Sequence, residues 1–145
     1  MAFMKRARLL SLAAVLALLI SACVPGAGPR LRVIHGQTWG ADFNVEVTRS
    51  VRSGLVLPVT LELAFSQRLN DITADASLAY NTALFRINTG DTTLTGHLGI
   101  DGSLTLSNPN RLLQFDGHFE GDVLRGTVSI GGFVPVGDVT FRRVR

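Results

Sequence analysis

Cysteine is almost absent from this chain, because Cys23 alone occurs among 145 residues. A single cysteine excludes an intramolecular disulfide, so a folded domain here depends on packing and hydrogen bonds. In an exported protein a lone cysteine indicates pairing with another molecule or chemical modification. The position of Cys23 in the chain decides between these two.

Motifs for catalysis and phosphate binding are also absent. The sequence contains no Gly-x-Ser-x-Gly elbow and no His-Glu-x-x-His pattern, and the glycines between residues 89 and 132 lack the spacing of a phosphate-binding loop. The acidic residues are scattered over turns and polar faces, which is typical of solvated carboxylates. We therefore expect no enzyme, no cofactor and no bound metal, with an envelope hydrolase as the remaining alternative.

Lysine occurs once, at Lys5, and the excess of positive charge lies around it. Lys5, Arg6 and Arg8 precede an apolar stretch, Leu9 to Ile20, and no acid occurs before residue 23. This stretch is shorter than the roughly 20 apolar residues of a transmembrane helix. A basic start, a short apolar region and small residues after it are typical of a secretory signal peptide.

Removal of that segment changes the charge of the protein. The whole chain has 14 cations against 11 acids, and three of the cations lie in the segment 1–22. The remainder is formally neutral, with 11 arginines and 11 acids. The net positive charge is therefore weak evidence for nucleic-acid binding, and no nucleic-acid partner is expected.

Small and aliphatic residues precede the cysteine. Ile20, Ser21 and Ala22 stand directly before Cys23. This pattern resembles the lipobox of bacterial lipoproteins, in which leucine is commoner than isoleucine at the first position. The resemblance covers only the signal peptide and Cys23.

The resemblance implies cleavage between Ala22 and Cys23, a diacylglycerol thioether on the Cys23 thiol, and a further acyl chain such as palmitate on its amine. Two or three chains give stable anchoring, whereas one chain binds a membrane only marginally. Val24 is not the aspartate that commonly signals inner-membrane retention. The expected location is therefore a cell-envelope membrane, the outer one if the organism has two.

Three regions follow from this interpretation. Residues 1–22 form the signal peptide, residues 23–30 carry the lipid and a tether, and residues 31–145 form a single β domain. The tether contains Pro25, Gly26, Gly28 and Pro29, which disfavour helix and central strand. Its extended reach is at most about 20–25 Å, so the domain is expected to sit close to the membrane.

Apolar residues recur at every second position from Leu31 onward, which predicts antiparallel strands. The longest run places Leu55, Leu57, Val59, Leu61, Leu63 and Phe65 on one face. Pro58 falls on the opposite face, which indicates an edge or a bulge. Similar alternation appears around Val45, Leu98, Leu104, Phe115, Leu124, Val128 and Phe141, with turns expected at Asp101-Gly102 and Gly121-Asp122.

These strands predict an all-β fold, a small antiparallel meander of eight or nine strands closing into a barrel. A β-sandwich is the alternative. One segment is ambiguous: a short helix around residues 71–84 competes with a strand, because Ile72, Ala76, Ala79 and Ala83 have helical spacing.

Two further features have weaker interpretations. His97 and His118 lie on polar strand faces, where they form a metal site with Asp116 or Glu120 only if adjacent strands bring them together. Two solvated histidines are the favoured reading. Gly36-Gln37-Thr38-Trp39 has one residue more than the Gly-x-Trp motif of lipocalins, so Trp39 is expected to close one end of the core.

The sequence therefore favours a lipid-anchored envelope lipoprotein whose β domain is a structural or protein-interaction module. The acyl chains on Cys23 contact the membrane, and an exposed sheet edge or face contacts another envelope protein. A barrel that carries a small apolar ligand or lipid is the alternative.

Overall fold

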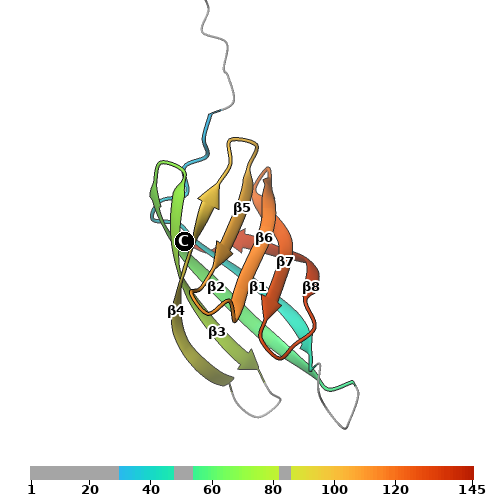
Figure 1. The fold of residues 1–145 in the computed structure, drawn as a ribbon. Coiled ribbons are helices and arrows are strands. Elements are labelled where there is room, and N and C mark those ends of the chain that lie inside the picture. Colours follow the sequence, from blue (N-terminus) through green and yellow to red (C-terminus); the bar gives the residue numbers. More distant parts are fainter. Residues whose placement is uncertain (1–29, 48–53, 82–85) are drawn as a thin grey trace, which may run out of the picture. The chain divides into compact units, whose positions relative to one another are not determined.

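A computed structural model describes residues 30–47, 54–81 and 86–145, and within it Leu31–Arg145 forms one compact unit. Its eight strands pair antiparallel in chain order and close into a barrel (Figure 1). They are β1 (Thr38–Glu46), β2 (Val56–Arg68), β3 (Asp71–Asn81), β4 (Arg86–Leu98), β5 (Ser103–Ser107), β6 (Leu113–Glu120), β7 (Val123–Ile130) and β8 (Val136–Arg143). The barrel predicted from the alternation is confirmed over the sandwich. No helix in the described ranges is long and apolar enough to cross a membrane.

Period-two alternation places one face of each strand in the interior. In β2 the side chains of Val59, Leu61, Leu63 and Phe65 are buried, and Ser66 on the other face is exposed. Each buried aliphatic or aromatic side chain contributes about 1.5–3 kcal/mol relative to exposure. A register slip of one residue would reverse every such side chain, so the pattern also determines the register.

Side chains fill the interior of the barrel. Eight strands enclose a space about as wide as the side chains that point into it. Phe115 and Phe141 meet edge to face with ring centroids 5.3 Å apart. The largest fully buried side chains of the described residues are Phe141, Ile34, Leu61, Leu63, Ile72, Leu94, Leu98, Leu104, Leu124, Val45, Val59 and Val128.

The incoming chain closes one end of the barrel, which we call the tether end. It comprises the segment Leu31–Gln37, the turn Leu69–Asn70, the turn Gly99–Gly102 and the turn Gly121–Asp122, because alternate turns of an up-and-down barrel share an end (Figure 1). Ile34 is fully buried there. Trp39 is buried as expected, and its ring meets that of Phe119 edge to face at 5.3 Å.

The opposite end is partly covered by the β7–β8 turn. Phe133 bridges to Val47, and the Val134 N–H donates to the Glu46 carbonyl at 2.8 Å. The rings of Phe133 and Tyr80 lie 5.8 Å apart. Both ends of the barrel therefore carry apolar side chains over the core.

Glycines on the inward face allow the strands to bend. An ideal Cβ on Gly96 would lie 1.7 Å from the Thr105 carbonyl oxygen, and on Gly117 it would lie 2.3 Å from the Arg125 carbonyl oxygen. Only glycine permits such an approach of neighbouring backbones, as at a barrel corner.

The helix considered for residues 71–84 is wrong within the described residues. Asp71–Asn81 is strand β3, with Ile72, Ala74, Ala76 and Leu78 buried, while residues 82–84 lie outside the description. Pairing with β2 runs without interruption from Arg68↔Asp71 to Val59↔Tyr80, so β3 keeps the strand period throughout. The β-bulge opposite Leu78 places its extra residue on β4, between Asn88 and Asp91.

Two residues assigned to the apolar face lie outside the core. Leu55 precedes β2 and is 50% exposed, and Ile100 lies in the β4–β5 turn and is 60% exposed. Both stand at the end of an alternating run, where the chain leaves the sheet. Pro58 pairs with Asn44 on β1, whereas the pairing of β2 with β3 begins only at Val59. Within the described residues this proline therefore has a strand neighbour on one side, as expected of a proline at an edge.

Candidate binding groove on the outer face of the barrel

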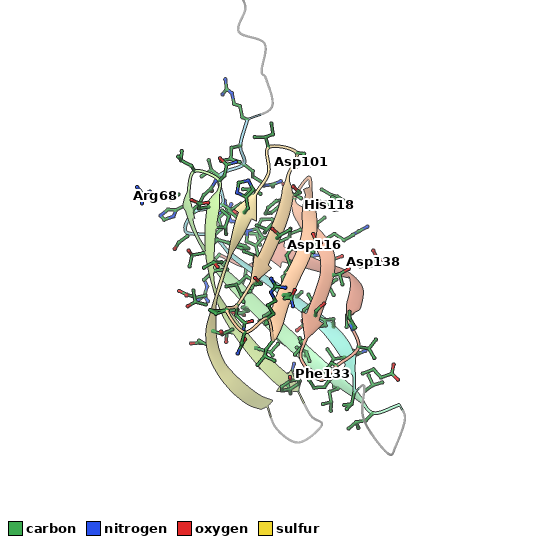
Figure 2. All side chains as sticks on the ribbon, in the orientation of Figure 1. Arg68, Asp101, Asp116, His118, Phe133 and Asp138 are labelled. Carbon is green, nitrogen blue, oxygen red and sulfur yellow. The ribbon has the colours of Figure 1, made fainter. Side chains whose placement is uncertain are left out.

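A surface hollow lies on the outer face of β4 to β7. It is an open groove of about 650 Å³, within the range of ligand sites. The residues around it are Thr95, Gly96, Thr105, Leu106, Ser107, Arg111, Gln114, Phe115, Asp116, Thr127 and Ser129. Figure 2 shows Asp116 midway along the barrel, between His118 at one end and Phe133 at the other.

Cross-strand register aligns the polar residues of the groove in two rows. One row runs through Thr95, Ser107, Gln114 and Ser129 on successive strands. The second row runs through His97, Thr105, Asp116 and Thr127. Side chains directly opposite each other on paired strands lie about 5 Å apart, so the outward face presents a continuous array of hydroxyl, amide and carboxylate groups.

The loop between β5 and β6 forms one wall of the groove. Asn108 is buried there, and its Oδ1 accepts a hydrogen bond from the Leu113 N–H at 3.1 Å. Arg111 has a φ of 55°, and its carbonyl accepts a hydrogen bond from Gln114 Nε2 at 2.9 Å. These contacts hold the wall, and within the described chain no hydrogen bond or ion pair is made by the hydroxyls of Thr105 and Thr127 or the carboxylate of Asp116.

An open sheet edge lies next to the groove. β4 pairs with β5 only through Thr95–Leu98, although its pairing with β3 begins at Arg86. Along Arg86–Leu94, β4 therefore pairs with β3 on one side and with no described strand on the other. Gly90, with a φ of 92°, lies at the bulge that interrupts this edge, a feature that disfavours unselective strand pairing. A short segment, Asp91–Leu94, continues directly into the floor of the groove.

The lipidation and cleavage residues, Ala22 and Cys23, lie outside the described residues. The candidate sites that the structure describes therefore lie on the barrel. The polar groove was not predicted from the sequence. The signal that points to it is the repeated Thr and Ser on the outward positions of consecutive strands, which sequence reasoning took as ordinary solvated faces.

The two histidines considered as metal ligands do not meet. His97 pairs with Thr105 on β5, and His118 pairs with Ser103 on β5, so the two lie on opposite sides of one strand. Strands two apart are separated by about 9.5 Å, and the register offsets His118 from His97 by a further two residues, about 7 Å along the strand. His118 Nε2 lies 2.7 Å from Glu120 Oε1 at the surface, and no group of three metal-ligating side chains occurs in the described ranges.

Among the residues that the structure describes, two groups have shifted pKa values, and both lie outside the groove. Hydrogen bonds from the Ser103 hydroxyl and N–H lower the pKa of Asp101 below 3.8. Burial raises the pKa of Tyr80 above 10.0. Asp101 belongs to the β4–β5 turn, and Tyr80 packs against Phe133 at the far end.

A second, smaller hollow lies at the tether end. Its volume is about 380 Å³, and Arg32, Trp39, Asp122 and Arg142 are among the residues around it. The Arg32 guanidinium stacks on the Phe119 ring at 4.3 Å, and Arg32 Nη2 donates to the Gly121 carbonyl at 2.7 Å. These contacts attach the incoming segment to the β6–β7 turn.

Comparisons of the chain with protein-family models, with curated proteins and with solved structures gave no match. The interpretation of the surface therefore depends on its own geometry and chemistry.

Proposed function

We propose that this protein is a lipid-anchored lipoprotein of the cell envelope, and that its barrel is an interaction module that binds a protein partner through the polar groove of β4 to β7. The acyl chains on Cys23 hold it at the membrane, the outer one where two exist. The groove and the adjacent β4 edge offer hydrogen-bonding groups to a peptide segment.

The observation that carries this proposal is the filled interior. Large side chains such as Phe115, Phe141, Leu61 and Leu94 occupy the centre of the barrel. A carrier of apolar ligands needs an internal space of several hundred Å³ instead. The filled core therefore favours a function on the outer surface over the carrier alternative.

The anchor is supported by the order of features around the single cysteine. Lys5, Arg6 and Arg8, the apolar stretch and Ile20-Ser21-Ala22 all precede Cys23 at the distances that a lipoprotein signal requires. The reach of residues 23–30 then limits the barrel to the vicinity of the membrane.

The anchor is tested by growing the native host with a radioactive fatty acid. We expect label in the wild-type protein, and a mature N-terminus at Cys23 by mass spectrometry. Label that persists in Cys23→Ser, or an intact segment 1–22 in the mature protein, would contradict the lipoprotein assignment.

The groove is tested by photocrosslinking in living cells. A photoreactive amino acid replaces Thr105 at the centre of the groove, and a matched one replaces Ala64, an exposed outward residue on β2. We expect one discrete adduct with a protein from Thr105 and none from Ala64. Equal patterns at the two positions would refute the groove as the binding face.

The carrier alternative is tested on the natively purified protein. Mass spectrometry after delipidation of Cys23 measures any lipid bound to the barrel. A stoichiometric lipid would overturn the interaction module in favour of the carrier.

A further inference from the structure

Three large apolar side chains project into solvent at the tether end. Val33, Leu69 and Ile100 are 72%, 81% and 60% exposed. Each stands in a loop or turn and not on a strand, so burial inside the barrel does not explain them. Val144 is exposed at this end too, and Leu55, Val56, Leu112 and Val134 are exposed elsewhere, but Val33, Leu69 and Ile100 are the three most exposed large apolar side chains of the described residues.

Leu69 occupies a backbone conformation that disfavours leucine. Its φ is 56°, in the left-handed region where glycine and asparagine are preferred. Leucine there is strained, and its side chain gains almost nothing from the core. The Leu69 side chain therefore stands clear of the core at the tip of the β2–β3 turn.

One glutamine ties these tips together. Gln67 Nε2 donates to the carbonyls of Arg32 at 2.9 Å and Leu69 at 3.0 Å, and Gln67 Oε1 accepts from the Ile34 N–H at 2.8 Å. The segment that carries Val33 and the turn that carries Leu69 are thus bonded to the same side chain.

The third tip is joined to the second through Asn70. The Leu98 N–H donates to the Asn70 carbonyl at 2.8 Å, and Asn70 Nδ2 donates to the Leu98 carbonyl at 3.1 Å. Ile100 follows two residues later. The three apolar tips are therefore held on one rigid end, where Figure 2 shows Arg68 and Asp101.

Arginines flank these tips. Arg68 is exposed beside Leu69, Arg32 adjoins Val33, and Arg142 and Arg143 end β8 at the same end. The acids there are Asp71, Asp101, Glu120 and Asp122, and Glu120 lies against His118 and 3.6 Å from Arg125. Apolar tips with adjacent arginines match the interfacial zone of a bilayer, where apolar groups enter and guanidinium groups meet phosphates.

The barrel chain also leaves toward its anchor from this end. Between Cys23 and Leu31 the chain can extend at most about 28 Å. We propose that the tether end of the barrel lies against the bilayer that holds Cys23, with Val33, Leu69 and Ile100 inserted among the lipid headgroups. This rests on the proposed lipid anchor and directs the groove of β4 to β7 sideways along the membrane.

The experiment uses the full lipidated chain in vesicles of phosphatidylethanolamine and phosphatidylglycerol. Acylated Cys23 has no free thiol, so a cysteine introduced at Val33 takes an environment-sensitive fluorophore at one position. Val134, at the opposite end and 41% exposed, receives the same label as the control. Nitroxide-bearing lipids then report which label touches the bilayer.

We expect blue-shifted emission and nitroxide quenching at position 33, and neither at position 134. The double variant Leu69→Asn, Ile100→Asn keeps the turn conformations, because asparagine tolerates the positive φ of Leu69 and is common in turns such as that of Ile100. Each apolar side chain kept out of the bilayer lowers the ratio of membrane-apposed to free barrel by about tenfold. Quenching at position 33 should therefore fall to the level of position 134.

A matched double variant at the far end, Leu55→Asn, Val56→Asn, changes side chains of similar exposure, 50% and 51%, and should leave quenching at position 33 unchanged. Fatty-acid content and sedimentation with vesicles are measured on every sample. A chain without fatty acid would overturn the proposed function. A chain with fatty acid but equal quenching at positions 33 and 134 would overturn this orientation alone.

Discussion

Replacement of Gly96 by alanine tests the bend of the barrel at the short pairing of β4 with β5. The added Cβ would lie 1.7 Å from the Thr105 carbonyl oxygen and 2.7 Å from the carbonyl carbon. Ordinary contact begins at 3.4 Å, so β5 must move away by roughly 1.7 Å, the difference between the two distances. The obstacle is backbone, which cannot rotate aside as a flexible side chain can.

That displacement acts on a weak seam. β4 and β5 share only the register pairs from Thr95↔Ser107 to Leu98↔Leu104. Overpacking alone costs about 1–3 kcal/mol, and each backbone hydrogen bond lost across the seam costs about 1 kcal/mol more. We expect Gly96→Ala to lower the free energy of unfolding by about 3–5 kcal/mol, a large part of the 5–15 kcal/mol typical of a domain.

The assay is thermal unfolding of the mature protein in detergent, followed by circular dichroism. A loss of 3–5 kcal/mol corresponds to a Tm lower by about 12–20 °C for a domain of this size. Gly137→Ala is the control, because nothing lies within 4 Å of the added Cβ, and it should be neutral or slightly stabilising. A Tm for Gly96→Ala within about 4 °C of wild type would refute the close approach of β4 and β5.

Three smaller predictions concern polar and titratable groups. Asn108→Ala should destabilise by about 1–3 kcal/mol in urea unfolding, since it leaves a buried N–H unpaired, whereas Asn110→Ala at the exposed neighbouring position should change stability by less than about 1 kcal/mol. The pKa of Asp101 lies below 3.8 because Ser103 donates hydrogen bonds to its carboxylate. The ionised Asp101 therefore stabilises the fold above its unfolded pKa, and this contribution disappears as the pH falls through the lower folded pKa. An NMR titration in which Ser103→Ala leaves this pKa unchanged would contradict the cause. Tyr80 is the one tyrosine, so absorbance titration should show its phenolate forming above pH 10.0 in the folded protein, and stability should decline above that pH because the unfolded chain ionises first.

The proposals for the groove and for the membrane-facing end fit together in one arrangement. If Leu69 and Ile100 touch lipid, the strands run roughly perpendicular to the membrane and their outer faces point sideways. Thr105 and Asp116 would then face a neighbouring envelope protein. The photocrosslinking and the nitroxide quenching measure these two surfaces independently.

Local sequence pattern determined which strands form and which way they face. Alternation in β2, from Val59 to Phe65, predicted burial correctly because the strand period of two is a property of the backbone itself. The turns at Gly102 and Gly121 were also found, since both glycines adopt positive φ, where side chains are disfavoured. Trp39 is buried in the core as expected, because a large apolar side chain on an inward strand face leaves water.

Tertiary structure alone decided the rest. The alanines of β3 fit both a helical and a strand period, and only the pairing of β3 with β2 and β4 decides for a strand. Barrel closure through Trp39↔Arg143 joins residues at opposite ends of the chain, and the separation of His97 from His118 depends on the register of a third strand. The sequence by itself determined most of the strands and their faces, because these depend on neighbours along the chain, and it predicts an anchor at Cys23 on the same local basis. The filled interior, the polar groove and the apolar tips of the tether end depend on which strands meet, and long-range pairing decides that.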